Sequence, residues 1–253
     1  MMRIGLVSVT YRKLSPEEVV SLSREAGVEC LEWGGDVHVP PGDLARARQV
    51  ASLTHDAGLS VAAYGSYYRL AVSEADGLPF EKVLESAVAL GAPVIRVWAG
   101  NKASSEADES YRQRVAADAL RIAGLAHAAH IKIAYEYHGG TLTDETASAR
   151  ALLDATVHPA VTTLWQPYNG ESLETCLTSL HSVIDRLSNV HVFHWWPDAG
   201  TRLPLAEGAE RWQQYLTVLR QAGKNPDLLL EFVPKDDPAV LAREVATLRR
   251  WLA

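Results

Sequence analysis

Two glutamates stand inside runs of hydrophobic residues, where a charged side chain is unexpected. Glu136 interrupts the run "IAYEYH", and Glu231 interrupts the run "LLLEFV". Charged groups are rarely fully buried unless they are paired or bind a metal. Two carboxylates in one site can also move a proton next to a carbonyl group, because one can remove it and the other can return it. We therefore treat Glu136 and Glu231 as candidate acid–base catalysts.

Histidine and amide side chains lie between the two glutamates along the chain. Gln166 ends the run "VTTLWQ", and His191 and His194 lie in "VHVFHW". Oxygen ligands with one imidazole suit Mg²⁺ or Mn²⁺ better than a zinc site rich in His or Cys. Such an ion could hold the oxygens of the enediolate that forms in the proton transfer. The alternative is that the glutamates are structural and form ion pairs with Arg96 or a lysine.

The elements that must position these residues repeat one pattern: a helical stretch, a glycine, and then a β-branched apolar run. The segments "EAGVECLEW", "DAGLSVAAY" and "ALGAPVIRVW" show it. Glycine suits the left-handed position that ends a helix. Helix starts are also marked, since Ser15, Pro16 and Glu18 provide a capping serine, a first-turn proline and a capping-box glutamate. This pattern predicts a helix over 16–26.

Eight strands are expected, and a helical segment follows each of them through to Pro238–Leu252. Their apolar runs are nearly continuous, as is typical of a parallel sheet covered by helices. The predicted strands are Ile4–Thr10, Glu29–Trp33, Ser60–Tyr64, Val94–Trp98, Ile131–Tyr137, Val161–Gln166, Val190–His194 and Leu228–Val233. Eight such units predict a single (β/α)8 TIM barrel domain over residues 1–253. A doubly wound open sheet is the main competitor, but no G-x-G-x-x-G motif follows the first strand.

Active sites of such barrels lie at the C-terminal ends of the strands. Candidate substrate contacts there are His38 in "LEWGGDVHVPPGD", Tyr67 in "AYGSYYRL" and Trp98 in "VIRVWAG". Aromatic faces pack well against the C–H surface of a sugar, although aromatic residues at barrel ends also serve as lids. Ordinary polarity of a solvated loop explains His38 nearly as well.

Composition narrows the functional classes. The net charge of −7 and the pI near 5.7 argue against nucleic acid as a partner, because phosphate binding needs clustered Lys and Arg. The two cysteines cannot form a disulfide framework. No signal peptide or membrane-spanning run is recognisable. We expect a soluble, cytoplasmic protein with no membrane partner; a homo-oligomer is compatible with the sequence.

The order of these residues resembles the xylose-isomerase-like barrel superfamily. That superfamily includes sugar isomerases, ketose 3-epimerases, inosose dehydratases and the metal-dependent endonuclease IV. The resemblance extends from "GLVSVTYRKLSPEEVV" to "LLLEFVPKDDPAV", and its best-matched segments are "GAPVIRVWAG", "IKIAYEYHGGTLTD" and "HVFHWWPDAGTRLPLAEG". It implies a TIM barrel with a divalent metal at the C-terminal ends of its strands and a small-molecule carbohydrate substrate.

The 3-epimerase branch implies particular residues as ligands. Its metal ligands are Glu, Asp, His and Glu, and the two glutamates also act as acid and base. Carried over, this implies Glu136, His194 and Glu231 as ligands, and Arg202 as a substrate contact. We expect His194 rather than His191 to be the ligand, because His191 lies three residues deeper in the strand. His191 is then expected to be a neutral histidine hydrogen-bonded inside the barrel.

The sixth strand departs from the family pattern, which reads Leu-Asp, two residues and then His. Here "WQPYN" places Gln166 at the aspartate and Asn169 at the histidine. Asn169 therefore becomes a candidate substrate contact. A glutamine carbonyl oxygen can bind Mg²⁺ or Mn²⁺ as a neutral ligand, but one negative charge is lost. The alternative is that no metal binds and the site has changed its use.

Three functions of different classes remain open. The first is a divalent-metal-dependent isomerase or epimerase of a sugar or sugar phosphate, which works through an enediolate. The second is a lyase or dehydratase that acts on an inosose or keto-glycoside with the same metal site. The third is a non-catalytic sugar-binding barrel. A nuclease like endonuclease IV would need a richer set of metal ligands and a basic groove, which this acidic chain does not supply.

We predict that Gln166→Asp binds Mn²⁺ more tightly than the wild-type protein does. The substitution restores a negative charge to the ligand set, and the charge of its ligands tunes the affinity of such a site. The measurement is a titration of Mn²⁺ into both metal-free proteins. Equal affinities would contradict the idea that Gln166 belongs to the metal site.

Overall fold

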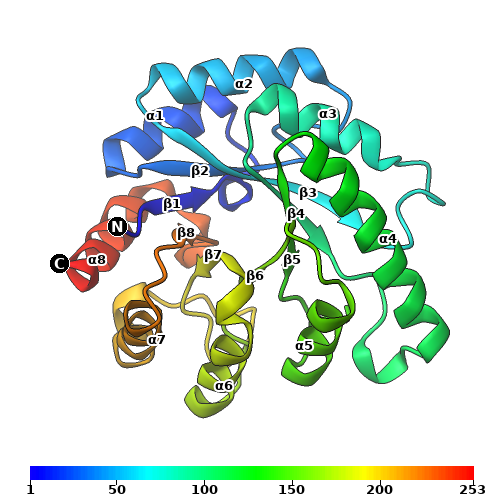
Figure 1. Ribbon diagram of the computed structural model, residues 1–253. Coiled ribbons are helices and arrows are strands. Elements are labelled where there is room, and N and C mark those ends of the chain that lie inside the picture. Colours follow the sequence, from blue (N-terminus) through cyan, green and yellow to red (C-terminus); the bar gives the residue numbers. More distant parts are fainter.

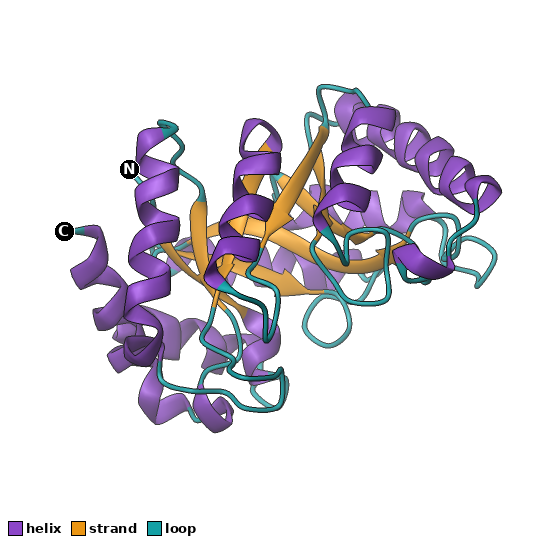
Figure 2. Cartoon of the chain, turned by 90° about the horizontal axis from the view of Figure 1, so that it is seen from below, coloured by secondary structure: helices purple, strands orange, loops and turns teal.

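A closed barrel of eight parallel strands forms the centre of the protein. The computed structural model describes all residues 1–253. Each strand pairs with the next along the chain, and β8 pairs with β1 to close the barrel. The helices surround the strands (Figures 1 and 2). The predicted TIM barrel is confirmed, and the open sheet that competed with it is excluded.

The strands and helices alternate along the whole chain. The strands are β1 Ile4–Val7, β2 Cys30–Gly34, β3 Ser60–Arg69, β4 Val94–Trp98, β5 Lys132–Glu136, β6 Val161–Trp165, β7 Leu187–Val192 and β8 Asp227–Leu230. The helices are α1 Pro16–Ala26, α2 Leu44–Asp56, α3 Phe80–Leu90, α4 Glu109–Ala128, α5 Thr146–Ala155, α6 Leu173–Val183, α7 Ala209–Gln221 and α8 Leu241–Leu252. Short 3₁₀ helices are η1 Ser8–Tyr11, η2 Ser104–Glu106, η3 Ile184–Arg186, η4 Leu205–Gly208, η5 Pro234–Asp236 and η6 Pro238–Val240.

Helix α1 has the bounds that its capping residues predict. The Ser15 side chain accepts a hydrogen bond from the backbone N–H of Glu18, and the Glu18 side chain accepts one from the backbone N–H of Ser15. The helix ends at Gly27, whose φ of 78° is left-handed. Local sequence therefore defines both ends of this helix.

Strand β7 differs from its prediction in a way that matters for the site. It was expected over Val190–His194 but spans Leu187–Val192. Its polar first residues still join the ladder, since Asn189 pairs with Asp227 of β8. As a result His191 lies within the strand, opposite Leu229, and His194 lies beyond its end.

The inner face of the barrel carries an apolar layer below a polar one. The apolar layer includes a separate buried cluster of Ala63, Val94, Ala134 and Leu164. Residues two positions apart on a strand share a face. Arg96, Glu136 and Gln166 therefore point inward from β4, β5 and the end of β6, one layer closer to the C-terminal ends of the strands.

None of the helices combines the length and the apolar composition that crossing a bilayer requires.

Candidate metal centre and active site

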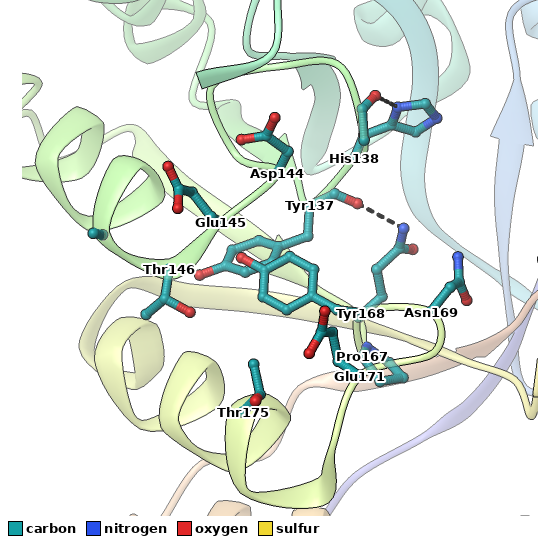
Figure 3. A pocket seen from close by; sticks show the side chains of 13 residues that line it. Tyr137, His138, Asp144, Glu145, Thr146, Pro167, Tyr168, Asn169, Glu171 and Thr175 are labelled. Carbon is teal, nitrogen blue, oxygen red and sulfur yellow. Dashed lines mark hydrogen bonds between the residues drawn. The ribbon is translucent and has the colours of Figure 1, made fainter. Parts of the chain in front are cut away.

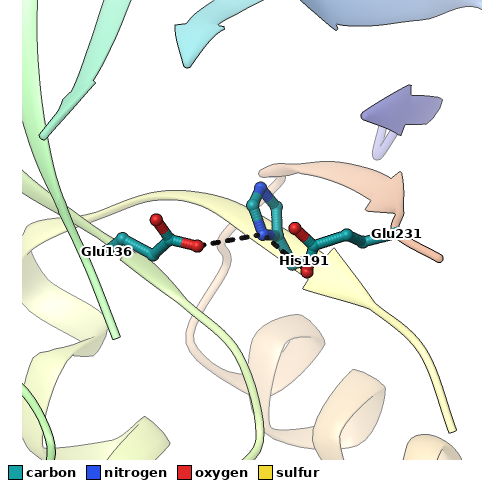
Figure 4. Close-up of side chains that lie close together, drawn as sticks. All are labelled: Glu136, His191 and Glu231. Carbon is teal, nitrogen blue, oxygen red and sulfur yellow. Dashed lines mark ion pairs between the residues drawn. The ribbon is translucent and has the colours of Figure 1, made fainter. Parts of the chain in front are cut away.

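Glu136, His191 and Glu231 converge inside the barrel. They come from β5, from β7 and from the residue after β8, and each offers a ligand atom within 4.8 Å of the others. His191 lies between the two carboxylates (Figure 4). Its Nδ1 is 3.4 Å from Glu231 Oε2 and 4.0 Å from Glu136 Oε1. All three side chains are buried, with exposed fractions of 3%, 0% and 6%.

Gln166 turns its carbonyl oxygen toward the same imidazole nitrogen. Its Nε2 donates a hydrogen bond of 2.6 Å to the backbone carbonyl oxygen of Tyr137. Because a carbonyl oxygen can only accept, this bond fixes which way the amide points. The amide oxygen Oε1 then lies 3.0 Å from Nδ1 of His191. Three side-chain oxygens, from three strand ends, thus face one nitrogen.

This arrangement suits a divalent cation. Nδ1 of His191 faces only oxygen acceptors, so it needs either a proton or a metal ion. Burial lowers the pKa of His191, but the carboxylates of Glu231 and Glu32 outweigh that effect and raise it to about 10. In the metal-free protein Nδ1 therefore carries a proton, whose place a cation would take. Oxygen ligands with one imidazole fit Mg²⁺ or Mn²⁺.

A second layer of charged side chains holds His191 in place. Its Nε2 donates to Oε2 of Glu32 over 3.1 Å. A carboxylate on the outer nitrogen is the usual support of a metal-binding histidine, because it fixes the tautomer and the ring orientation. Burial would raise the pKa of Glu32, yet Arg96 and His191 lower it to about 2. Glu32 therefore stays ionised although it is fully buried.

Arg96 connects this second layer to the first. Its Nε donates to Oε1 of Glu32 over 2.6 Å, and its Nη1 donates to Oε2 of Glu136. Nε1 of Trp98 donates to the same Glu136 oxygen. The other oxygen of Glu136, Oε1, is left facing His191. The ion pair expected in the structural alternative is thus present for Glu136, whereas Glu231 forms an ion pair with His191 alone.

The structure brings His191, and not His194, to the glutamates. His194 lies beyond β7 and packs against Gly208, in a small pocket that Asn169 and Arg211 also line. Burial and the nearby Arg211 lower its pKa. The preference for His194 is corrected on geometric grounds, because β7 ends earlier than predicted. The expectation that His191 is hydrogen-bonded inside the barrel is met, but its charged neighbours favour the protonated form.

The predicted substrate contacts are scattered around the barrel mouth. His38 is buried, and its two ring nitrogens form hydrogen bonds with the Ser8 hydroxyl and with the backbone carbonyl of Leu14. Arg202 donates two hydrogen bonds, of 2.6 and 2.7 Å, to the Asp236 carboxylate. The structure does not bring either residue to the glutamates.

Two predicted aromatic contacts do lie beside the metal group, by which we mean Glu136, Gln166, His191 and Glu231. Trp98 donates a hydrogen bond to Glu136. The Trp98 and Tyr67 rings pack edge to face, with their centres 5.6 Å apart. The guanidinium carbon of Arg96 lies 4.9 Å from the centre of the Tyr67 ring. Tyr67 has a φ of 57°, which is uncommon for a residue other than glycine. These rings flank the site on the β3 and β4 side.

Glu32 and Arg96 were not expected to support the site. From the sequence, Arg96 was considered only as a structural ion-pair partner of the glutamates. Both interrupt apolar strands, in "CLEWG" and "VIRVW", as Glu136 does in "KIAYE". That shared pattern is the signal that could have identified them.

A pocket of about 510 Å³ opens beside the metal group. Gln166 lines it, together with residues that follow β5 and β6 (Figure 3). Asn169, the remaining predicted substrate contact, is exposed on its rim. The pocket therefore lies next to Gln166 at the C-terminal ends of the strands, where barrel enzymes bind their substrates.

The fold and the site together define a TIM barrel with a Glu–Gln–His–Glu group at the C-terminal ends of its strands. The family described as xylose isomerase-like TIM barrel matches residues 20–251, and the chain belongs to it. No curated protein is similar enough in sequence to match the chain.

Solved structures share the fold at low sequence identity. The probable 3-DHS dehydratase AsbF of Bacillus anthracis has 19% identity and a TM-score of 0.80, covering 98% of this chain and 99% of its own. The 3-keto-D-glucoside 4-epimerase YcjR of E. coli has 16% identity and a TM-score of 0.76, covering 99% and 100%. A xylose isomerase-like TIM barrel protein of Mycobacterium smegmatis, in complex with magnesium, has 16% identity and a TM-score of 0.73, covering 100% and 98%.

We predict that His191→Ala loses Mn²⁺ binding and that His194→Ala keeps it. Only His191 places a nitrogen among the ligand oxygens. Its loss should therefore lower the affinity for Mn²⁺ by more than the roughly 10–100-fold that outer-shell mutations cause. The measurement is a Mn²⁺ titration of each metal-free variant, with circular dichroism as a check of folding. The reverse ranking would reinstate His194 as the ligand.

We also predict that Gly65→Ala lowers the free energy of unfolding by about 1–3 kcal/mol, the usual cost of overpacking a core. A Cβ at Gly65 would lie 2.6 Å from Arg96 Nη2 and 2.8 Å from Glu32 Oε1. The matched control is Gly124→Ala in α4, where a Cβ would meet no atom within 4 Å. Urea unfolding measures both variants, and equal stabilities would show that the Glu32–Arg96 pair tolerates displacement.

Proposed function

We propose that this protein is a divalent-metal-dependent epimerase or isomerase of a small carbohydrate. Glu136, Gln166, His191 and Glu231 hold Mg²⁺ or Mn²⁺, and the two glutamates move the proton. One observation carries the proposal: two buried carboxylates and an amide oxygen, from separate strand ends, face the same imidazole nitrogen. The fold shared with an epimerase and with a magnesium-bound protein supports it.

The bound ion would polarise the substrate carbonyl and make the adjacent C–H bond more acidic. The charges of the site are matched to this role. Glu136 and Glu231 balance a divalent ion, and the Glu32–Arg96 pair is neutral by itself. A loaded site therefore buries no net charge, which a low-dielectric interior requires.

The two glutamates differ in their hydrogen bonds, and this suggests different roles. Glu136 accepts from Arg96 and Trp98 through Oε2, so that oxygen is held in a fixed position. Glu231 has His191 as its only ion-pair partner. Because its carboxylate is less constrained by donors, Glu231 is the better base for the first proton transfer. Glu136 then relays a proton from solvent water to the opposite face of the enediolate, and Glu231 releases the abstracted proton to solvent, so both carboxylates return to their starting state.

A lyase or dehydratase remains the second candidate, and one similar structure is that of a probable dehydratase. It would use the same proton abstraction and differ in the group that leaves the enolate. A sugar-binding barrel without catalysis is the non-enzymatic alternative.

The test is proton–deuterium exchange into a panel of ketoses in heavy water, followed by NMR. We expect exchange with the wild-type protein and Mn²⁺, and a loss of about 10²–10⁴-fold in Glu231→Gln and in Glu136→Gln, the usual range for acid–base catalysis. Glu85→Gln, an exposed change on α3, is the matched control and should exchange at the wild-type rate. Elimination without epimerised product would favour the lyase, and sugar binding without exchange would favour the binding protein.

A further inference from the structure

A second pocket at the barrel mouth, of about 440 Å³, is rich in positive charge. It lies between the segments after β1 and β8, and Arg12, Lys13 and Lys235 line it. Asp236 is the only acidic residue of the lining, and its carboxylate already accepts two hydrogen bonds from Arg202. Three cations thus surround one pocket in a chain whose net charge is −7.

The two lysines of this pocket are not balanced by a carboxylate. Neither Lys13 nor Lys235 forms an ion pair or a side-chain hydrogen bond, whereas Arg12 pairs with Asp36, which lies outside the lining. An ammonium group has three donors and no acceptor. Water can satisfy an exposed lysine, so the charges alone do not define a site, but an anion placed here would find donors from both segments.

The segment after β8 has a strained backbone. Phe232, Lys235 and Asp236 have φ values of 46°, 59° and 51°, in the left-handed region that disfavours residues with a side chain. Only six residues of the chain other than glycine have a positive φ, and three of them lie within positions 232–236. Conformations of this kind collect at active sites and ligand clamps, where the surrounding structure holds them. The strained segment places Lys235 in the pocket wall only four residues after Glu231.

Arg12 connects the pocket to the residues beside the metal group. Its Nη2 donates to the Tyr67 hydroxyl over 2.7 Å, and its guanidinium carbon lies 5.3 Å from the centre of the Phe232 ring. The Tyr67 ring packs against Arg96, and Phe232 directly follows Glu231. These contacts hold the guanidinium in place before a ligand arrives, which lowers the entropy lost on binding.

Arg12 also keeps donors for a ligand. A guanidinium has five N–H donors. Three of the donors of Arg12 are used, by Asp36, by Tyr67 and by the backbone carbonyl of Val9. The remaining donors lie on the two terminal nitrogens, the pair that recognises the oxygens of a phosphate or a carboxylate.

We propose that this pocket binds an anionic group of the substrate, a phosphate or a carboxylate, and that the protein acts on an anionic carbohydrate. The reacting carbonyl lies at the metal group, and the inference rests on the proposed function for that end only. The pocket beside Gln166 is lined by three acidic residues and by no lysine or arginine, so it repels the same anion. Charge therefore gives the substrate one favourable direction across the metal group.

The experiment compares three ligands that lack a ketone or aldehyde and are not turned over: a hexitol, the same hexitol with a terminal phosphate, and the corresponding hexonate. Calorimetric titration of the Mg²⁺-loaded full chain should show an anion binding at least about tenfold more tightly than the hexitol, since a hydrogen bond to a charged group has that effect on affinity. The anion that binds more tightly identifies the group, phosphate or carboxylate, that the pocket takes. Binding of both anions no tighter than that of the hexitol would overturn the proposal.

Charge reversal tests whether this pocket is responsible. Lys235→Glu should abolish the preference for the anion, because it replaces a cation of the lining with a negative charge, and Lys235→Arg should retain it. Lys132→Glu makes the same charge change at the exposed first residue of β5, at the opposite end of the barrel, and should leave the preference unchanged. Circular dichroism checks that each variant is folded. Equal preferences in Lys235→Glu and Lys132→Glu would show that the pocket does not hold the anion.

The two proposals fail in different ways. If the anion preference depends on Lys235 but neither ketoses nor their phosphates and acids exchange a proton, the proposed function is wrong and the pocket assignment stands. If free ketoses exchange as fast as their anionic counterparts at equal low concentration, the pocket assignment is wrong and the proposed function stands.

Discussion

Three carboxylates are buried together in the upper layer of one barrel, and their mutual repulsion must be compensated. Burying an ion without a partner costs several kcal/mol. Arg96 compensates two of them, since it pairs with Glu32 and Glu136, and the protonated His191 faces Glu32 and Glu231. The small side chains beneath the site follow from this requirement, because Gly65 leaves the space in which Glu32 and Arg96 meet.

The same charge balance gives a physical reason for a glutamine at the end of β6. A divalent ion with Glu136 and Glu231 is already neutral, so a third carboxylate in the ligand set would leave a buried negative charge. The amide supplies an oxygen without that charge, and its nitrogen is satisfied by the Tyr137 backbone. Gln166 and Arg96 therefore belong to one electrostatic arrangement, although they lie on different strands.

Sequence reasoning located the barrel and both glutamates because they depend on local signals. Apolar runs, glycine stops and a charge inside an apolar strand are all visible in a single chain. The sequence favoured His194 because the predicted strand ran to His194, whereas β7 ends at Val192. Side-chain alternation separates His191 from His194, which lie three residues apart and so face opposite sides of an extended strand. Glu32 and Arg96 show the same signal, a charge inside an apolar strand, but their pairing does not show in a single sequence, since Arg96 lies 64 residues from Glu32 and 40 from Glu136.

Gln166 belongs to two environments at once: its amide oxygen is part of the metal group, and its side chain forms part of the pocket wall. A single hydrogen bond to Tyr137 sets its orientation. In the proposed metal site, any molecule that shifts this amide would alter the affinity of the ion. Thermodynamic linkage would then require the ion to alter the affinity of that molecule by the same factor. One rotatable side chain would thereby couple the occupancy of the ion site to that of the pocket.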